Sequence, residues 1–174
     1  MATVSGGALL DQTLKKIGDK IGKAREVRVG FLEGATYPDG SSVASVAAIN
    51  NFGAPAAGIP ARPFFSSMIA NKSPDWGERF ARVLKLCDYD TDLALARMGS
   101  GIQGQLAQSI VDFSGAPNSP VTDLLKQRFP THDGMTFEDV QQARRDVAAG
   151  ETAPAGKPLV WSGDMLKSID QEVA

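Results

Sequence analysis

Glycine and proline gather in clusters along this chain, and the clusters divide it into short blocks. Eighteen glycines and ten prolines stand among 174 residues, with clear groups at residues 53–63, 114–121 and 151–157. Each proline restricts the backbone and tends to end a helix or strand, and each glycine permits turns that other residues resist. The chain is therefore expected to consist of separate secondary-structure elements joined by stiffened surface loops.

The first third of the chain contains the clearest local patterns. Apolar residues at helical spacing predict an amphipathic helix over residues 8–23. Residues 26–32 alternate, with Val27, Val29 and Phe31 on one face, and this pattern predicts a strand. Ser41 or Ser42 is a suitable cap for a helix that ends at Phe52-Gly53, where glycine permits a positive φ.

Two longer helical patterns follow, one over residues 64–87 that Pro74 interrupts or restarts, and one over residues 92–113. The short connection between them predicts an antiparallel helical hairpin. We expect a short helix at 122–129, an inserted helix capped by Thr136 within 130–157, and a mobile segment at 151–157.

The C-terminal block predicts a turn of helix capped by Ser162 and a final strand within residues 170–173. The fold class expected from these elements is α+β, in one domain covering residues 1–174. A small antiparallel sheet would contain residues 26–32 and the C-terminal strand, packed by the helical hairpin.

Composition excludes several classes of protein. A formal net charge of -2 is unlike that of a protein whose main task is to coat nucleic acid. A single cysteine, Cys87, excludes an internal disulfide, and with a single histidine, His132, it cannot form a zinc site of the usual ligand type. No apolar run approaches the roughly 20 residues that a membrane span requires. We also find no signal-peptide pattern. We expect a soluble protein made in the cytoplasm.

Several motifs resemble catalytic or cofactor sites but fail on context. Residues 99–104 match G-x-G-x-x-G, yet a helix rather than a strand precedes them, so we expect the glycines to allow close helix packing. Asp88, Asp90 and Asp92 begin like a calcium loop, but that loop lacks its glycine and glutamate. His132 is expected in a solvated loop, and Cys87 as a buried small hydrophobe. We expect no catalytic residue, no cofactor and no metal.

Two segments are more informative than these motifs. The first runs Tyr37-Pro-Asp-Gly-Ser-Ser-Val-Ala-Ser-Val-Ala-Ala-Ile-Asn-Asn-Phe-Gly53 and continues with Ile59-Pro-Ala-Arg-Pro-Phe-Phe65. The second is Lys157-Pro-Leu-Val-Trp-Ser-Gly-Asp-Met-Leu-Lys-Ser-Ile169. Between them, Pro117-Asn-Ser-Pro120 is followed by Thr122 and Lys126.

The order and spacing of these segments resemble the tail-completion, or neck, proteins of long-tailed bacteriophages. The resemblance covers residues 26–129 and 157–173. Family members show a helix ending in Asn-Glu-Phe-Gly, then Ile-Pro-x-Arg-Pro-Phe, and later Pro-Leu-Val-Asp-Thr-Gly. This chain departs from the pattern at Asn51, Trp161 and Ser162, and its insertion is longer. A Mu-like virion morphogenesis protein and a tail terminator are neighbouring interpretations.

This resemblance implies a structural virion protein without enzymatic activity. Copies would form a homo-oligomeric ring, of six subunits by the family pattern, at the head–tail junction. Its partners would be the tail tube or tail terminator protein and the neck or head-connector protein. DNA would pass through the lumen without sequence-specific binding, and no membrane is involved. The alternative from another class is a small soluble hydrolase or nucleotide-binding enzyme, which needs a polar constellation that the sequence does not show.

The interface residues that we single out carry either an exposed aromatic ring or a polar group on a stiff loop. Arg62 precedes a proline, so we expect it to be extended and to point outward, toward a carboxylate of its own chain or of a neighbour. One ring of the adjacent pair Phe64 and Phe65 belongs in the core and the other is free to contact a partner. Trp161 is either a binding anchor or a partly buried ring. The complete set is Tyr37, Asp39, Phe52, Arg62, Phe64, Phe65, Trp161, Ser162 and Asp164.

Overall fold

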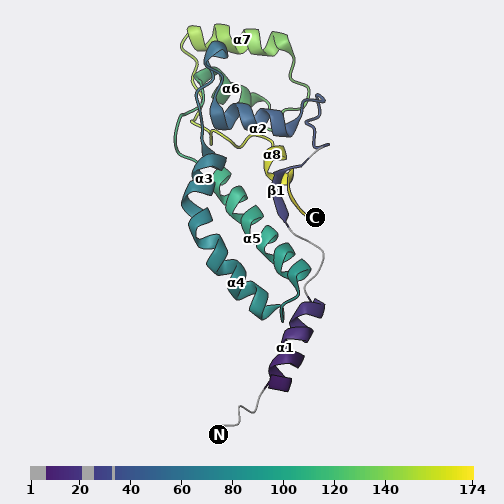
Figure 1. The fold of residues 1–174 in the computed structure, drawn as a ribbon. Coiled ribbons are helices and arrows are strands. Elements are labelled where there is room, and N and C mark those ends of the chain that lie inside the picture. Colours follow the sequence, from purple (N-terminus) through teal and green to yellow (C-terminus); the bar gives the residue numbers. More distant parts are fainter. Residues whose placement is uncertain (1–6, 21–25, 33) are drawn as a thin grey trace.

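The computed structural model describes residues 7–20, 26–32 and 34–174, and it has the expected α+β architecture (Figure 1). The structure contains longer α-helices, short 3-10 turns and two paired strands. In chain order these are α1 (Gly7–Lys20), β1 (Val27–Phe31), α2 (Val43–Phe52), η1 (Pro55–Ala57), α3 (Phe64–Lys72), η2 (Ser73–Asp75), α4 (Trp76–Leu86), α5 (Thr91–Val111), α6 (Pro120–Arg128), α7 (Phe137–Ala148), α8 (Asp164–Lys167) and β2 (Ile169–Val173).

The two strands pair the start of the part of the molecule that follows α1, here called the body, with the C-terminal end of the chain. They pair in antiparallel register from Val27 opposite Val173 to Phe31 opposite Ile169. Helix α5 packs across both strands. A Cβ on Gly99 would lie 2.7 Å from Val27 Cγ2 and 2.5 Å from the Gln171 side chain, so glycine is what lets this helix approach the sheet.

The glycine motif therefore has a packing role, but a different one from that expected. Gly99 brings a helix against a sheet, whereas the expectation was contact between helices. A Cβ on Gly101 or Gly104 would meet nothing within 4 Å. These two glycines thus have no close-packing role in the described structure.

The helical hairpin has the expected antiparallel form. Helices α4 and α5 pack side by side, and the Asp90 carboxylate caps α5 by accepting a hydrogen bond of 2.9 Å from the Leu93 amide. The proline at position 74 falls in η2 and breaks the first helical pattern into α3 and α4. Cys87 is buried at the end of α4, as predicted.

The main core lies where α2, α3, α5 and the C-terminal segment meet. Its largest fully buried side chains include Val43, Leu106 and Ile110. Burial of each such side chain contributes about 1.5–3 kcal/mol. Leu159, Met165 and Ile169 carry the C-terminal segment into the same core, so residues separated by more than 100 positions hold the body together.

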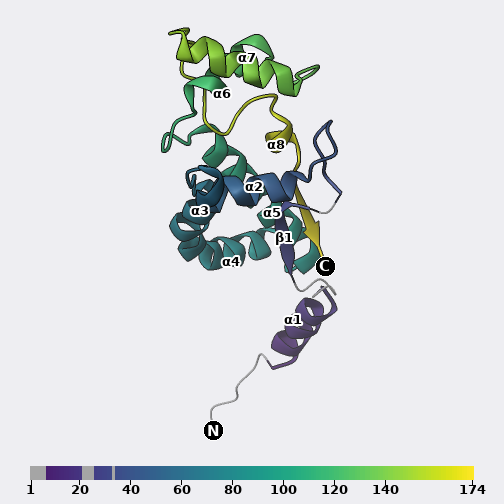
Figure 2. The same ribbon diagram turned by 90° about the horizontal axis from the view of Figure 1, so that it is seen from above.

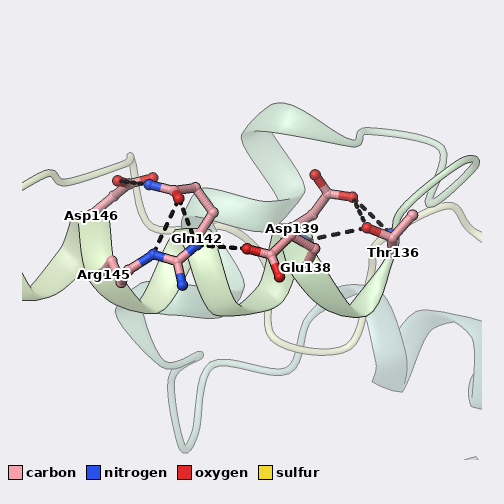
Figure 3. A network of polar contacts seen from close by, with 6 residues as sticks. All are labelled: Thr136, Glu138, Asp139, Gln142, Arg145 and Asp146. Carbon is pink, nitrogen blue, oxygen red and sulfur yellow. Dashed lines mark hydrogen bonds and ion pairs between the residues drawn. The ribbon is translucent and has the colours of Figure 1, made fainter.

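A second, smaller core lies between α6 and α7. Its buried members are Leu124, Leu125 and Ala143. Thr136 begins α7 with a capping box, in which its hydroxyl accepts from the Asp139 amide and the Asp139 carboxylate accepts from the Thr136 amide (Figure 3). The insertion at 130–157 is therefore packed on α6 by its own hydrophobic cluster.

The segment at 151–157, which we expected to be mobile, is held by polar contacts. Glu151 pairs with Arg128 at 2.9 Å. The Gly156 amide donates to Asp123 at 3.1 Å, and the Lys157 ammonium donates to the Val111 carbonyl at 3.1 Å. Such contacts explain how a proline- and glycine-containing stretch is ordered without a helix or strand.

Helix α1 stands apart from the rest of the molecule. In both views it lies beyond the turn between α4 and α5 and points away from the other helices (Figures 1 and 2). An ion pair between Lys20 and Asp88 joins its last turn to that turn. The helix was expected to continue to residue 23, but positions 21–23 lie outside the described residues. Within the described ranges, no helix combines the length and apolar character needed to cross a membrane.

Candidate functional site

A cleft of about 350 Å³ opens where the two cores meet. Its walls come from the turn after residue 36, from α2, from α6 and from the segment that precedes α8. Both cores contribute, with Leu159 and Met165 from the main core and Trp161 from the second. The cleft brings together six of the interface residues named above: Tyr37, Asp39, Arg62, Trp161, Ser162 and Asp164.

Arg62 forms part of the wall of this cleft and is directed inward. Its side chain is buried, donating from Nε to the Ala116 carbonyl at 3.0 Å and from Nη2 to the Pro117 carbonyl at 2.9 Å. A third bond, from Nη1, reaches Asn50 Oδ1 at 3.3 Å. Burial lowers the pKa of the guanidinium from its ordinary value.

The expectation that Arg62 points outward is therefore wrong, and the alternative of a contact within its own chain is the one observed. The acceptors of that contact are two carbonyls and a side-chain amide, whereas a carboxylate was expected. The residue before a proline has an extended backbone, but backbone form does not fix where a long side chain ends. Here the main-chain carbonyls of the proline-rich loop supply the acceptors.

Lys126 ties a second loop to the cleft in the same way. Its ammonium donates to the carbonyls of Lys157 at 2.6 Å and Val160 at 2.8 Å. Burial lowers the pKa of this ammonium, with an opposing effect from Asp123. Sequence reasoning noted Lys126 as part of a motif but not as a site residue, because a lysine on a short polar helix gives no signal of inward orientation.

Trp161 is half-buried in the structure, so the partly buried alternative holds. Its indole Nε1 donates to the Phe129 carbonyl at 2.7 Å, and the Lys126 ammonium lies 5.9 Å from the ring centroid. The His132 ring meets Trp161 edge-on, at a centroid distance of 4.5 Å. His132 lies in a loop, as expected, but it is partly buried rather than fully solvated, because the tryptophan gives it an aromatic surface to pack against.

Two acidic residues also line the cleft. Asp39 accepts hydrogen bonds from the amide and hydroxyl of Ser41, at 2.9 and 2.6 Å, and these bonds lower the pKa of its carboxyl. The Ser162 hydroxyl bonds to Asp164 and lowers the pKa of that carboxyl. Burial, followed by the charges of Asp164 and Asp39, raises the pKa of the Tyr37 phenol. At neutral pH the cleft therefore presents two ionised carboxylates beside a neutral phenol.

Ser162 does not cap α8, contrary to expectation. Gly163 occupies the cap position with φ of 84°, and no side chain caps the helix there. The serine hydroxyl instead bonds to Asp164 inside the first turn. A serine and an aspartate two positions apart can each hydrogen-bond to nearby groups at the start of a helix. The sequence does not show which bonds they will form.

The three remaining interface residues lie at a separate groove of about 360 Å³ between β1, α2 and α3. Phe64 is buried, and its ring meets Phe31 edge-on. Phe65 is half-buried beside it, while Phe52 is 73% exposed. The prediction that one of the adjacent phenylalanines enters the core is confirmed, and Phe64 is that residue.

Asn51 is a structural residue that sequence reasoning missed. It is buried at the end of α2, and its Oδ1 accepts from the amides of Phe65 and Ser66, each at 3.0 Å. It thereby caps α3, whose own cap position is Pro63 and provides no side-chain hydrogen bond. The sequence did offer one signal: helix α3 starts directly after Pro63, whose side chain cannot cap it, so a cap from elsewhere in the chain was required.

Among residues 7–20, 26–32 and 34–174, no group of three or more His, Cys, Asp or Glu side chains is placed to hold a metal ion. The two cations of the cleft are bonded to main-chain carbonyls. Comparisons with protein-family models, with curated proteins and with solved structures find no match for this chain.

Proposed function

We propose that this chain is a structural subunit of the bacteriophage head–tail junction, where copies form a ring that joins the tail to the neck. The observation that carries the proposal is that parts of each tail-completion motif converge in space. Residues 37–41, Arg62, 118–126 and 158–165 are distant in sequence, yet all contribute to one cleft. Motifs that serve one interaction are expected to meet at one surface.

The construction of the cleft suits a subunit that must keep its shape while neighbours grip it. Arg62 and Lys126 fasten two proline-containing loops to the body through four bonds to carbonyl oxygens. A loop that is already ordered loses little conformational entropy when a partner binds. The carboxylate of Asp39, which is exposed, then remains available for a partner.

A ring requires a contact in which one surface of a subunit meets a different surface of the next. The groove at Phe52 is a candidate for one such surface, and it is separate from the cleft. The tail tube or terminator would dock on one side of the ring and the head connector on the other. DNA would pass through the lumen, and a net charge of -2 gives a subunit without a strong general attraction for phosphate.

The proposal is tested by genetic removal and complementation in the phage whose genome encodes the chain. A stop codon in this gene should leave DNA-filled heads and finished tails that do not join. The wild-type chain supplied in trans should restore joining. Asp39→Ala, which removes a carboxylate of the cleft without touching either core, should restore it poorly.

Asp75→Ala, at an exposed position in η2 away from the cleft, is the matched control and should complement fully. Tails of irregular length in the stop mutant would assign the chain to tail termination instead. Joined, infectious particles in the absence of the chain would refute the proposal.

A further inference from the structure

We propose that helix α1 of one copy docks in the groove between β1 and α2 of the next copy. This inference rests on the proposed ring and deepens it by naming the two surfaces that meet. One is a helix without a covering partner in the described structure. The other is an apolar groove beside an edge strand.

Helix α1 presents an apolar stripe to solvent. Leu10, Leu14 and Ile17 recur at the spacing that places them on one face of a helix. Leu10 is 60% exposed and Leu14 is 56% exposed. Helices shorter than about 12–15 residues are marginal in water unless a tertiary contact covers their apolar face, and α1 has 14 residues. The stripe therefore requires a surface to cover it.

The polar residues of α1 make such a contact feasible. Asp11, Lys15, Lys16 and Asp19 lie on other faces of the helix than the stripe. Docking through Leu10, Leu14 and Ile17 consequently buries apolar surface and leaves the charged groups at the rim in water. Burial of unpaired charge, which would oppose the contact, is avoided.

The groove offers the complementary surface. Ala44 and Ala48 on α2 are exposed and small, and Phe52 projects beside them with 73% of its surface in solvent. Val29 and Phe65 form the other walls and are half-buried. Small residues flanked by large rings form a shallow channel into which leucine side chains can fit.

The strand beside the groove favours a helix as the occupant. In the described sheet β1 pairs with β2 on one side, so its other side is an open edge. Open edges invite uncontrolled pairing with other chains, and proteins commonly protect them by covering them with a helix. A docked α1 would cover this edge as well as the apolar groove.

The positions of the two surfaces indicate that the contact joins different copies. The ion pair between Lys20 and Asp88 holds α1 at the α4–α5 turn. In both views β1 lies between α1 and α2, and α1 points away from the body (Figures 1 and 2). An arm on one side and its receptor on the other give a head-to-tail contact, which closes into a ring when the rotation between copies permits it.

Cross-linking between differently tagged copies of the full chain tests this inference. Leu14→Cys is placed in one copy and Phe52→Cys in a copy with a larger tag, and a short bismaleimide linker is added to the mixture. The native Cys87 is 7% exposed and is therefore shielded from the reagent. We expect a product that contains both tags, and at least a five-fold lower yield when Leu86→Cys replaces Phe52→Cys. Leu86 is 78% exposed at the tip of the hairpin, which makes it a control of matched exposure.

Two results would overturn the inference: a preferred link between two Leu14→Cys copies, or no mixed product at any concentration. A third would come from a chain that carries both Leu14→Cys and Phe52→Cys, if it forms the link only within itself. A second readout is Leu14→Lys, which should abolish concentration-dependent association in sedimentation velocity, while Lys16→Ala on another face should preserve it. Association unchanged by Leu14→Lys would equally refute the contact. Failure of the head–tail joining experiment, with the mixed cross-link present, would refute the phage function and leave the arm contact standing.

Discussion

The polar cleft and the apolar groove use their conspicuous residues in opposite ways. In the cleft, the side chains of Arg62, Lys126 and Trp161 donate hydrogen bonds to carbonyl oxygens of their own chain. At the groove, Phe52 is 73% exposed. The three cleft residues therefore stabilise the fold, whereas Phe52 is free to contact a neighbour.

This difference separates stability from assembly. A change at a side chain that bridges loops should lower the free energy of unfolding, and any loss of assembly would follow from that. A change at an exposed ring should leave unfolding unchanged and affect assembly alone. The predictions below test the distinction in order of expected effect on stability.

Arg62→Ala should have the largest effect. It leaves the carbonyls of Ala116 and Pro117 and the Asn50 amide oxygen without their donor in a buried setting. Hydrogen bonds to a charged group contribute about 1.5–3 kcal/mol each, so we expect a loss of roughly 3 kcal/mol or more in the free energy of unfolding. Urea denaturation measures it. Arg79→Ala, at an exposed position on α4, is the control, and equal stability of the two variants would contradict the role given to Arg62.

Trp161→Ala should follow, with a loss of about 2–3 kcal/mol. The Phe129 carbonyl loses its indole donor and His132 loses the ring against which it packs. Trp161→Phe should recover part of the loss, because it restores the aromatic packing without the donor. Thermal unfolding of both variants measures the effect. If Trp161→Ala has the same melting temperature as the wild type, the Trp161 ring, like that of Phe52, does not stabilise the fold.

Thr136→Ala should destabilise the protein by about 1 kcal/mol, through loss of the capping box that begins α7. Hydrogen exchange should show faster exchange in α7 and little change in α5. Thr136→Ser, which keeps the hydroxyl, should stay near the wild type. Uniform protection changes across both helices would mean that the second core unfolds only together with the first.

Asp164→Asn should alter the dependence of stability on pH. The Ser162 hydroxyl lowers the pKa of this carboxyl in the folded protein, so the stability it provides is present above the unfolded value of about 3.9 and is lost as pH falls through the folded pKa. We therefore expect a shallower fall in unfolding free energy between about pH 5 and pH 2. Ser162→Ala should flatten the profile in the same direction. If the wild type and both variants lose unfolding free energy equally as pH falls, the Asp164 carboxylate does not contribute to the loss of stability in acid.

Phe52→Ser should have the smallest effect on the fold. Surface substitutions usually change stability by less than about 0.5 kcal/mol, and this ring is mostly in solvent. Association between copies should nevertheless weaken, which sedimentation equilibrium measures. A large drop in melting temperature would show that Phe52 is part of the core and would erase the contrast with Arg62.

The local patterns of the sequence predict the elements well. Alternation at Val27, Val29 and Phe31 marks β1, and the break at Pro74 separates α3 from α4. The pairing of the first strand with the C-terminal strand was also predicted. Apolar periodicity and turn chemistry act over a few residues, and the sequence reports them directly.

The contacts inside the cleft depend on tertiary structure, and the sequence reports them poorly. Arg62 finds its acceptors more than 50 positions away, in the loop at Ala116 and Pro117. Asn51 caps a helix that starts 13 residues later. No local pattern encodes which carbonyl a long side chain will reach, so the orientation of Arg62 was predicted wrongly.

The account proposes that a bacteriophage encodes this chain, and high-resolution electron microscopy of that phage's particles tests this central claim most directly. The account predicts a ring of copies at the head–tail junction around an open channel, with α1 of each subunit in the groove of its neighbour. A junction built entirely from other polypeptides, with this chain absent from the purified particles, would contradict it.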